Sequence, residues 1–214
     1  IGDFSVVGHF EPASECGGDW WNYSVVGGKL YLWIGDATGH GAPAAMVTSA
    51  AKAAATIIES IPGVTPGQAM GVLNKAIAET TKGRILMTFF IGAIDLKTGE
   101  MIYANASHEP PYIIRGGTEK VSKKNLEPLI DVGGSRLGDN RDAVYEEGKA
   151  QLNAGDAILM YTDGIVDLKN LEGKAWGERG FIKSICESAS ASKVLDGRLL
   201  ELKNKITTYR QKTE

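Results

Sequence analysis

The sequence is short of cysteine, of excess positive charge and of long apolar runs, and each shortage excludes a class of protein. Its two cysteines, Cys16 and Cys186, are too few for a disulfide framework or a zinc site, and we favour two reduced thiols over one oxidised pair. Acidic residues outnumber basic ones by 26 to 23, which predicts no binding to nucleic acid or to an anionic membrane surface. The most apolar stretch, residues 46–61, contains Lys52 and Glu59 and is too short to span a bilayer. What remains is a globular protein, which we expect in the cytoplasm.

The domain organisation follows from length and composition. A chain of 214 residues with 43% hydrophobic residues can bury a substantial core, and this excludes a disordered or fibrous protein. No internal repeat or linker-like stretch divides the chain, so we expect one domain over residues 1–214. The sequence opens at Ile1, without an initiator Met and close to a β-rich run, which predicts a domain excised from a longer protein.

Hydrophobic periodicity predicts strands with a pair of helices inserted among them. Strands are expected at residues 5–10, 20–26, 30–34, 85–95, 101–106, 111–115, 144–152 and 156–162. One helix is expected from Pro43 to about residue 61, and a second begins at Thr65 as N-cap, with Gln68 completing a capping box. From Glu178 onward the pattern is helical again. This order favours an α+β layered sandwich over a doubly wound parallel sheet.

Glycine is abundant, and several glycines stand beside aspartates at strand ends. The sequence has 27 glycines among its 214 residues, which is roughly twice the usual share of ~7%. Asp19, Asp36 and Asp163 each lie at the edge of an apolar strand, with glycine alongside. A carboxylate at such a position is costly unless it is paired or bound to a metal, and oxygen ligands select Mg²⁺ or Mn²⁺. Asp-Gly segments also form ordinary turns, so the pattern leaves a metal site and a set of turns as alternatives.

Four blocks of sequence occur in a recognisable order. They are ECGGD (15–19) followed by two tryptophans, GDATGHG (35–41), YANASH (103–108) followed by two prolines, and LNAGD (152–156) leading to YTDG (161–164). With these blocks the sequence resembles, over essentially its whole length, the bacterial SpoIIE/RsbU-type serine phosphatases of the protein phosphatase 2C (PPM) superfamily. The resemblance implies a PPM-type β-sandwich flanked by helical layers, an αββα arrangement within the α+β class.

The resemblance also implies a binuclear Mn²⁺ or Mg²⁺ centre and a role for each aspartate. Asp36 would bridge both metals, and the backbone carbonyl of Ala37 would ligate one of them. Asp163 would bind the second metal, and Asp19 would support the first directly or through water. A metal-activated water would then hydrolyse phosphoserine or phosphothreonine without a protein nucleophile. Asp36 and Asp163 are therefore the expected catalytic residues.

The partners implied by the resemblance are those of a signalling phosphatase. The expected substrate is a phosphorylated STAS-type anti-sigma factor antagonist in a bacterial partner-switching pathway. A sensor or receiver segment is expected before the phosphatase domain. The two helices between residues 43 and 81 are the expected site of homodimer formation and of regulation.

Some residues depart from the family pattern. The family usually ends with an Asp-Asp pair on a last strand, whereas this sequence ends Arg-Gln-Lys-Thr-Glu, so either the sequence stops short of that strand or the metal site is incomplete. Ser107 stands where glycine is common. The alternatives to a protein phosphatase are a degenerate phosphatase fold that only binds a partner and a hydrolase of small phosphorylated molecules. His40 and His108 can each be structural or functional.

Overall fold

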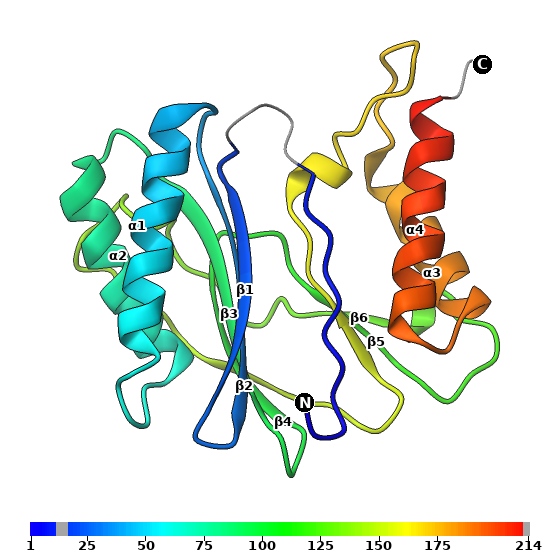
Figure 1. The fold of residues 1–214 in the computed structure, drawn as a ribbon, viewed down its shortest axis with the longest axis horizontal. Helices are drawn as coiled ribbons and strands as arrows, with labels where there is room; N and C mark the ends of the chain where they lie inside the picture. Colours follow the sequence, from blue (N-terminus) through cyan, green and yellow to red (C-terminus); the bar gives the residue numbers. More distant parts are fainter. Residues whose placement is uncertain (12–16, 212–214) are drawn as a thin grey trace. The chain divides into compact units, whose positions relative to one another are not determined.

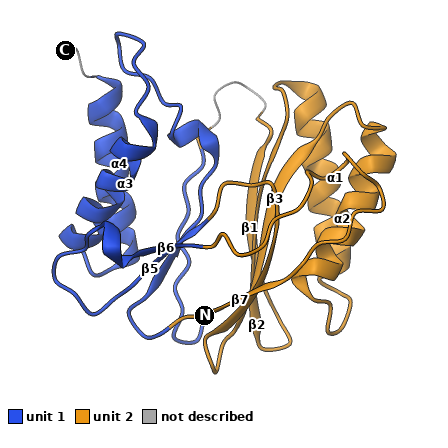
Figure 2. Ribbon diagram, turned by 180° about the vertical axis from the view of Figure 1, so that it is seen from behind, with its two compact units in different colours: residues 1–10, 111–128, 153–214 blue, residues 11–110, 129–152 orange. Residues whose placement is uncertain are grey.

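The computed structural model describes residues 1–11 and 17–211, and its contacts divide the chain into two compact units (Figure 2). Unit 1 comprises residues 1–10, 111–128 and 153–214, and unit 2 comprises residues 11–110 and 129–152. The chain therefore alternates between the units instead of finishing one before it starts the other. Each unit has its own sheet and its own helices.

In the described part of the chain, unit 2 is built on a five-stranded antiparallel sheet with the order β1-β2-β3-β4-β7. Its strands are β1 (Asp19–Val26), β2 (Lys29–Ala37), β3 (Met87–Asp95), β4 (Glu100–Ala106) and β7 (Gly148–Gln151). Gly27 and Gly28 form the predicted two-residue turn between β1 and β2. Such a tight turn sets the register of the two strands and so decides which side chains lie opposite each other.

Two helices, α1 (Ala42–Ile58) and α2 (Pro66–Thr81), cover one face of this sheet (Figure 1). The predicted start of α2 is confirmed. The backbone N–H of Gln68 donates to Thr65 Oγ1 at 3.4 Å, and the backbone N–H of Thr65 donates to Gln68 Oε1 at 3.1 Å. Pro43 lies in the first turn of α1, also as predicted, because its missing N–H has no partner to lose there.

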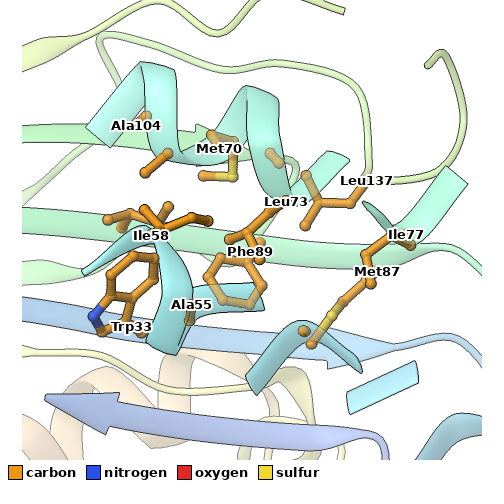
Figure 3. Packing of buried hydrophobic residues seen from close by; sticks show 14 of the residues in the cluster. Trp33, Ala55, Ile58, Met70, Leu73, Ile77, Met87, Phe89, Ala104 and Leu137 are labelled. Carbon is orange, nitrogen blue, oxygen red and sulfur yellow. The ribbon is translucent and has the colours of Figure 1, made fainter. Parts of the chain in front are cut away.

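The core of unit 2 lies between these helices and the sheet (Figure 3). Trp33 of β2 and Phe89 of β3 meet edge to face with ring centroids 6.5 Å apart, and Leu73 of α2 is fully buried with them. Side chains alternate along a strand, so the odd-numbered residues of β2 and β3 enter this core. The even-numbered residues, which include Asp36 and Thr88, consequently lie on the face away from the helices.

A buried asparagine joins α2 to the segment 138–141. The side chain of Asn74 is fully buried, and its Nδ2 donates to the carbonyl oxygens of Asn140 and Arg141 at 2.8 and 3.0 Å. Its Oδ1 accepts from the backbone N–H of Gly138 at 2.9 Å. Both donors of the amide are therefore used, and the helix and the segment are held together.

Unit 1 has a smaller antiparallel sheet with the order β6-β5-β8. Its elements are β5 (Tyr112–Ile114), η1 (Lys123–Asn125), β6 (Leu126–Pro128), β8 (Ala157–Leu159), η2 (Asp163–Ile165), α3 (Gly177–Ala191) and α4 (Leu195–Arg210). Phe181 of α3 is fully buried and packs on Tyr161 with ring centroids 4.7 Å apart. Leu202 of α4 closes the same cluster.

The antiparallel sheets and helices α1 to α4 confirm the predicted α+β class. The strand predicted at residues 5–10 is wrong, because these residues lie outside both sheets and β propensity is expressed only on a paired surface. The strand predicted at residues 144–152 is shortened to β7, and the edge strand β6, which ends in proline, was not predicted. Within residues 1–11 and 17–211, no helix has the length and apolar character needed to cross a membrane.

Candidate functional site

A row of polar side chains crosses three strands of unit 2 on the face away from the helices. Asp19 of β1 lies directly opposite Asp36 of β2, and Asp36 lies directly opposite Thr88 of β3. Opposed residues of antiparallel strands carry their side chains on the same face, with Cβ atoms about 4.5–5.5 Å apart. The register therefore brings two of the predicted ligands, Asp19 and Asp36, together, and both are half-buried.

Gly18 lies so close to the end of β2 that no larger residue fits. A Cβ atom on Gly18 would lie 2.5 Å from the carbonyl oxygen of Ala37 and 3.1 Å from Oδ1 of Asp36. Both oxygens belong to predicted metal ligands, and they face the same small space. The glycine before Asp19 is therefore required by a close approach of oxygen atoms, and a side chain would fill the space they share.

Hydrogen bonds on several sides hold the backbone at Ala37. Its N–H donates to the carbonyl of Gly18 at 3.1 Å, and the N–H of Thr38 donates to the carbonyl of Leu86 at 2.8 Å. The N–H of Leu86 in turn donates to Thr38 Oγ1 at 3.0 Å. Thr48 Oγ1, from α1, donates to the carbonyl of Gly18 at 2.9 Å. The position of the Ala37 carbonyl is thus set before any ligand binds.

The remaining glycines of the GDATGHG block have a backbone explanation. Gly39 and Gly41 have φ values of 91° and 77°, in the left-handed region that glycine adopts without strain. They turn the chain from the end of β2 into the start of α1. His40 between them is exposed.

The oxygen atoms gathered in unit 2 fit a hard divalent cation. Carboxylate and carbonyl oxygens are the ligands that Mg²⁺ and Mn²⁺ prefer, and two opposed carboxylates repel unless positive charge lies between them. Within residues 1–11 and 17–211, no group of three His, Cys, Asp or Glu side chains is arranged to hold a metal. The oxygen atoms that unit 2 gathers here are thus those of two carboxylates, Asp19 and Asp36, and of one main-chain carbonyl, Ala37.

Asp163, the remaining predicted ligand, belongs to unit 1. Its side chain is exposed at the start of η2, and its carbonyl accepts from the N–H groups of Val166 and Asp167 at 2.8 and 3.0 Å. Tyr161, two residues earlier, is buried and anchors this segment on α3. The structure therefore brings Asp19 and Asp36 together in one unit and places Asp163 in the other.

Asp156 of the LNAGD block holds the strand that leads to Asp163. Its carboxylate accepts from the N–H groups of Gly116 and Asn153 at 2.7 and 3.1 Å and from Arg115 Nη1 at 2.7 Å. Burial alone would raise the pKa of this carboxyl, but the backbone N–H groups and the Arg115 guanidinium lower the pKa below its usual value. Asp156 therefore has a structural role in this block.

His108 of the YANASH block extends the polar row of unit 2. Its side chain is 5% exposed, and its Nδ1 lies 2.9 Å from Thr88 Oγ1. The backbone N–H of His108 donates to Asn105 Oδ1 at 2.7 Å, and Asn105 Nδ2 donates to the carbonyl of His108 at 3.1 Å. The imidazole is therefore held next to the residue that lies opposite Asp36.

Sequence reasoning did not assign Thr88 to the site, because Thr88 belongs to no motif and only the register of β2 and β3 reveals it. Gly18 and Asn105 lie inside recognised blocks, but their roles depend on contacts that spacing does not show. Two residues singled out from the sequence, Glu15 and Cys16, lie outside the described residues. Cys186 is a free thiol in α3.

Comparison with known proteins places the chain in one family. Residues 26–212 match the family model described as Stage II sporulation protein E (SpoIIE). Phosphoserine phosphatase RsbU of Bacillus subtilis (strain 168) is 26% identical over 164 residues, which are 76% of this chain and 46% of that protein. The chain thus spans about half the length of this curated relative.

Solved structures share the fold. The SiaA-PP2C domain of Pseudomonas aeruginosa superposes with a TM-score of 0.76 at 21% identity, over 93% of this chain and 76% of that chain. A structure of the PP2C phosphatase domain of SpoIIE from Bacillus subtilis, with a fragment of its regulatory domain, superposes with a TM-score of 0.65 at 22% identity, over 90% of this chain and 55% of that chain. The fold is therefore that of PP2C-type phosphatase domains, as predicted.

Proposed function

We propose that this chain, which belongs to the stage II sporulation protein E (SpoIIE) family, is a metal-dependent protein phosphatase that acts on phosphoserine and phosphothreonine. One observation carries the proposal: Asp36 Oδ1 and the Ala37 carbonyl oxygen face one space beside Gly18, with Asp19 directly opposite Asp36. Similarity to a relative named as a phosphoserine phosphatase supports the same reaction class.

The proposed ligands are Asp19, Asp36 and the Ala37 carbonyl of unit 2, with Asp163 of unit 1 as a further ligand. Asp36 and Asp163 are the proposed catalytic residues, and the proposed cofactors are two Mn²⁺ or Mg²⁺ ions. When bound, such ions lower the pKa of a coordinated water and neutralise charge that develops on a transferring phosphoryl group. The assignment of Asp163 rests on its place in the YTDG block.

The contribution of the chain itself is preorganisation. The Ala37 carbonyl is held by the hydrogen bonds at Gly18 and Thr38, so it does not need to move when a cation arrives. Groups fixed in advance stabilise developing charge without the cost of reorganisation. Asp36 lies in the middle of the polar row, and its replacement should therefore affect the reaction more than replacement of an exposed carboxylate outside the site, such as Asp139.

The family resemblance supplies the proposed partners. The proposed substrate is a phosphorylated STAS-domain anti-sigma factor antagonist, and the proposed regulator is a sensor or receiver segment before this domain, in the cytoplasm. A homodimer through α1 and α2 is also proposed. Its support is the apolar surface of α1, on which Met46 is 71% exposed and Ile57 is 67% exposed.

The proposed function is tested by hydrolysis of p-nitrophenyl phosphate while Mn²⁺ is titrated. Wild type and Asp139→Asn, a matched change at an exposed aspartate of the same unit, should both turn over in a Mn²⁺-dependent way. Asp36→Asn should lower this turnover by about 100-fold or more. Phosphoserine peptides assayed in parallel separate a protein phosphatase from a hydrolase of small phosphorylated molecules.

Two results would contradict the proposal. A folded wild-type protein that shows no turnover at saturating Mn²⁺ would favour the non-enzymatic binding module. Turnover that survives Asp36→Asn would place the metal at other residues.

A further inference from the structure

A cavity of about 320 Å³ opens in unit 2 between the turn that follows β4 and the segment 129–134. Its polar wall consists of Asn105, Ser107 and His108, and its apolar wall includes Leu129, Ile130 and Val132. Among the described residues that line it, none is Asp, Glu, Lys or Arg. Ligand pockets range from about 300 to 1,000 Å³ and combine an apolar lining with a few placed polar groups. The size and lining suit an uncharged group of the size of one or two side chains.

The polar wall of the cavity is connected to the row of residues at Asp36. Thr88 Oγ1 lies 2.9 Å from Nδ1 of His108 and 3.5 Å from the carbonyl oxygen of Asp36. The two hydrogen bonds between Asn105 and the His108 backbone fix the start of the turn that bounds the cavity. One threonine thus separates a wall of the cavity from the backbone of Asp36, which carries the proposed catalytic carboxylate.

Ser107 joins the two walls and does so in a strained conformation. Its φ of 56° is left-handed, which costs a non-glycine residue about 1–2 kcal/mol. Its Oγ donates to the carbonyl of Gly134 at 2.7 Å, across the cavity from β4. Backbone strain of this kind is concentrated at binding and catalytic sites, where the surrounding structure maintains it.

We propose that this cavity is a substrate subsite, which receives an apolar side chain of the phosphoprotein within two residues of the phosphorylated serine or threonine. The inference rests on the proposed phosphatase function, because Asp36 marks where the phosphoryl group binds. An extended peptide advances ~3.3 Å per residue, so a side chain one or two positions from the phosphorylated residue reaches a wall that lies two successive contacts from Asp36.

The lining determines which side chain fits. A charged side chain would lose its hydration in a cavity whose described lining has no counter-charge, whereas an apolar one would gain from burial. Ile130 lines the cavity and is 66% exposed, so apolar area remains there for an incoming side chain to cover. We therefore expect leucine to be accepted and aspartate to be rejected next to the phosphorylated residue.

The subsite is tested with five-residue phosphoserine peptides that carry Leu, Asp or Lys at each position around a central phosphoserine, in an alanine background. Phosphate release by the wild-type protein with Mn²⁺ should favour Leu over Asp at one position by about tenfold or more in kcat/KM. The same peptides with an uncleavable phosphonate in place of the phosphate report binding by fluorescence anisotropy. Binding gives the preference independently of turnover.

Two variants of the lining probe the cavity directly. Gly133 lines it, and a Cβ there would meet nothing within 4 Å, so Gly133→Phe adds a ring that competes for the space. The ratio of Leu to Asp peptides should then fall toward one. Ile130→Glu, at an exposed position, should shift the preference from Leu to Lys. Gly71→Phe in α2, where a Cβ also meets nothing within 4 Å, is the matched control and should keep the ratio.

The outcomes separate the subsite from the reaction. A wild-type protein with no Leu preference in binding or turnover would overturn the subsite, even while phosphate release continues. A preference that is unchanged in both Gly133→Phe and Ile130→Glu would also overturn it. Leu-dependent binding without phosphate release from any peptide would leave the subsite in place and overturn the phosphatase.

Discussion

Replacing Gly18 by alanine should damage the proposed metal site far more than it damages the fold. The new Cβ would lie 2.5 Å from the Ala37 carbonyl oxygen, whereas such carbon–oxygen contacts normally begin near 3.3 Å, so the two atoms must separate by about 0.8 Å. Two hydrogen bonds to the Gly18 carbonyl resist this separation, one from the Ala37 N–H and one from Thr48 Oγ1. The displacement therefore falls on the oxygen atoms that Asp36 and Ala37 present.

The magnitude follows from the size of the displacement. Overpacking a tight contact costs about 1–3 kcal/mol of the free energy of unfolding, which an intact core can absorb. A displacement near 1 Å at a reacting centre can cost about 100-fold in rate. For Gly18→Ala we expect a folded protein whose turnover of p-nitrophenyl phosphate drops about 100-fold and whose affinity for Mn²⁺ falls.

The assay combines three measurements on one preparation. Isothermal titration calorimetry gives the Mn²⁺ affinity, steady-state kinetics gives kcat/KM, and urea unfolding gives the free energy of unfolding. The control is Gly71→Ala, in the interior of α2, where the added methyl group meets nothing within 4 Å. It should leave Mn²⁺ affinity unchanged and stabilise the helix by up to about 1 kcal/mol. If Gly18→Ala binds Mn²⁺ and turns over within twofold of wild type, the reasoning about the shared oxygen space is wrong.

Two further predictions concern stability. Asn74→Ala leaves three backbone groups of the segment 138–141 without their hydrogen-bond partner, at about 1 kcal/mol each. The free energy of unfolding, measured in urea, should therefore fall by about 3 kcal/mol. An unchanged free energy would show that water replaces the amide. Asp156 has a lowered pKa in the folded state, so its contribution to stability is present above the unfolded-state pKa of about 3.9 and is lost as the pH falls through the folded-state pKa. Thermal unfolding curves of wild type and Asp156→Asn should therefore converge between about pH 6 and pH 2, and a constant difference would exclude the ion pair with Arg115 as the cause.

The sequence predicts best those features that depend on neighbours along the chain. The Thr65–Gln68 capping box, Pro43 in the first turn of α1 and the turn at Gly27 and Gly28 are all local, and the structure confirms each of them. Local signals work here because one or two hydrogen bonds within four residues decide the conformation. The motif blocks likewise led to Asp19 and Asp36, which the structure brings together.

Features that depend on pairing between distant segments were not predictable in the same way. Thr88 joins the site because β3 pairs with β2 in one register out of several, and no property of Thr88 alone reveals this. Residues 5–10 have strand-like composition but lie outside both sheets, whereas β6, with its proline, forms an edge strand because β5 offers a partner. The metal-binding roles of Asp19, Asp36, Ala37 and Asp163 stay predictions, and the variants Asp36→Asn and Gly18→Ala test those of Asp36 and Ala37.

The alternation of the chain between its two units has a consequence for protein synthesis. Chains emerge from the ribosome N-terminus first, so β1 to β4 of unit 2 appear well before β7, which pairs with β4. Residues 111–128, which belong to unit 1, emerge in between, and β5 can pair with β6 at once but must wait for β8 on its other edge. Until residue 148 or so has been made, β4 carries an unpaired edge of the kind that promotes aggregation. A nascent chain that stalls after β4 and before β7 would be a client for chaperones and proteases. Because each unit is built from separate segments of the chain, neither unit could be obtained by simple truncation.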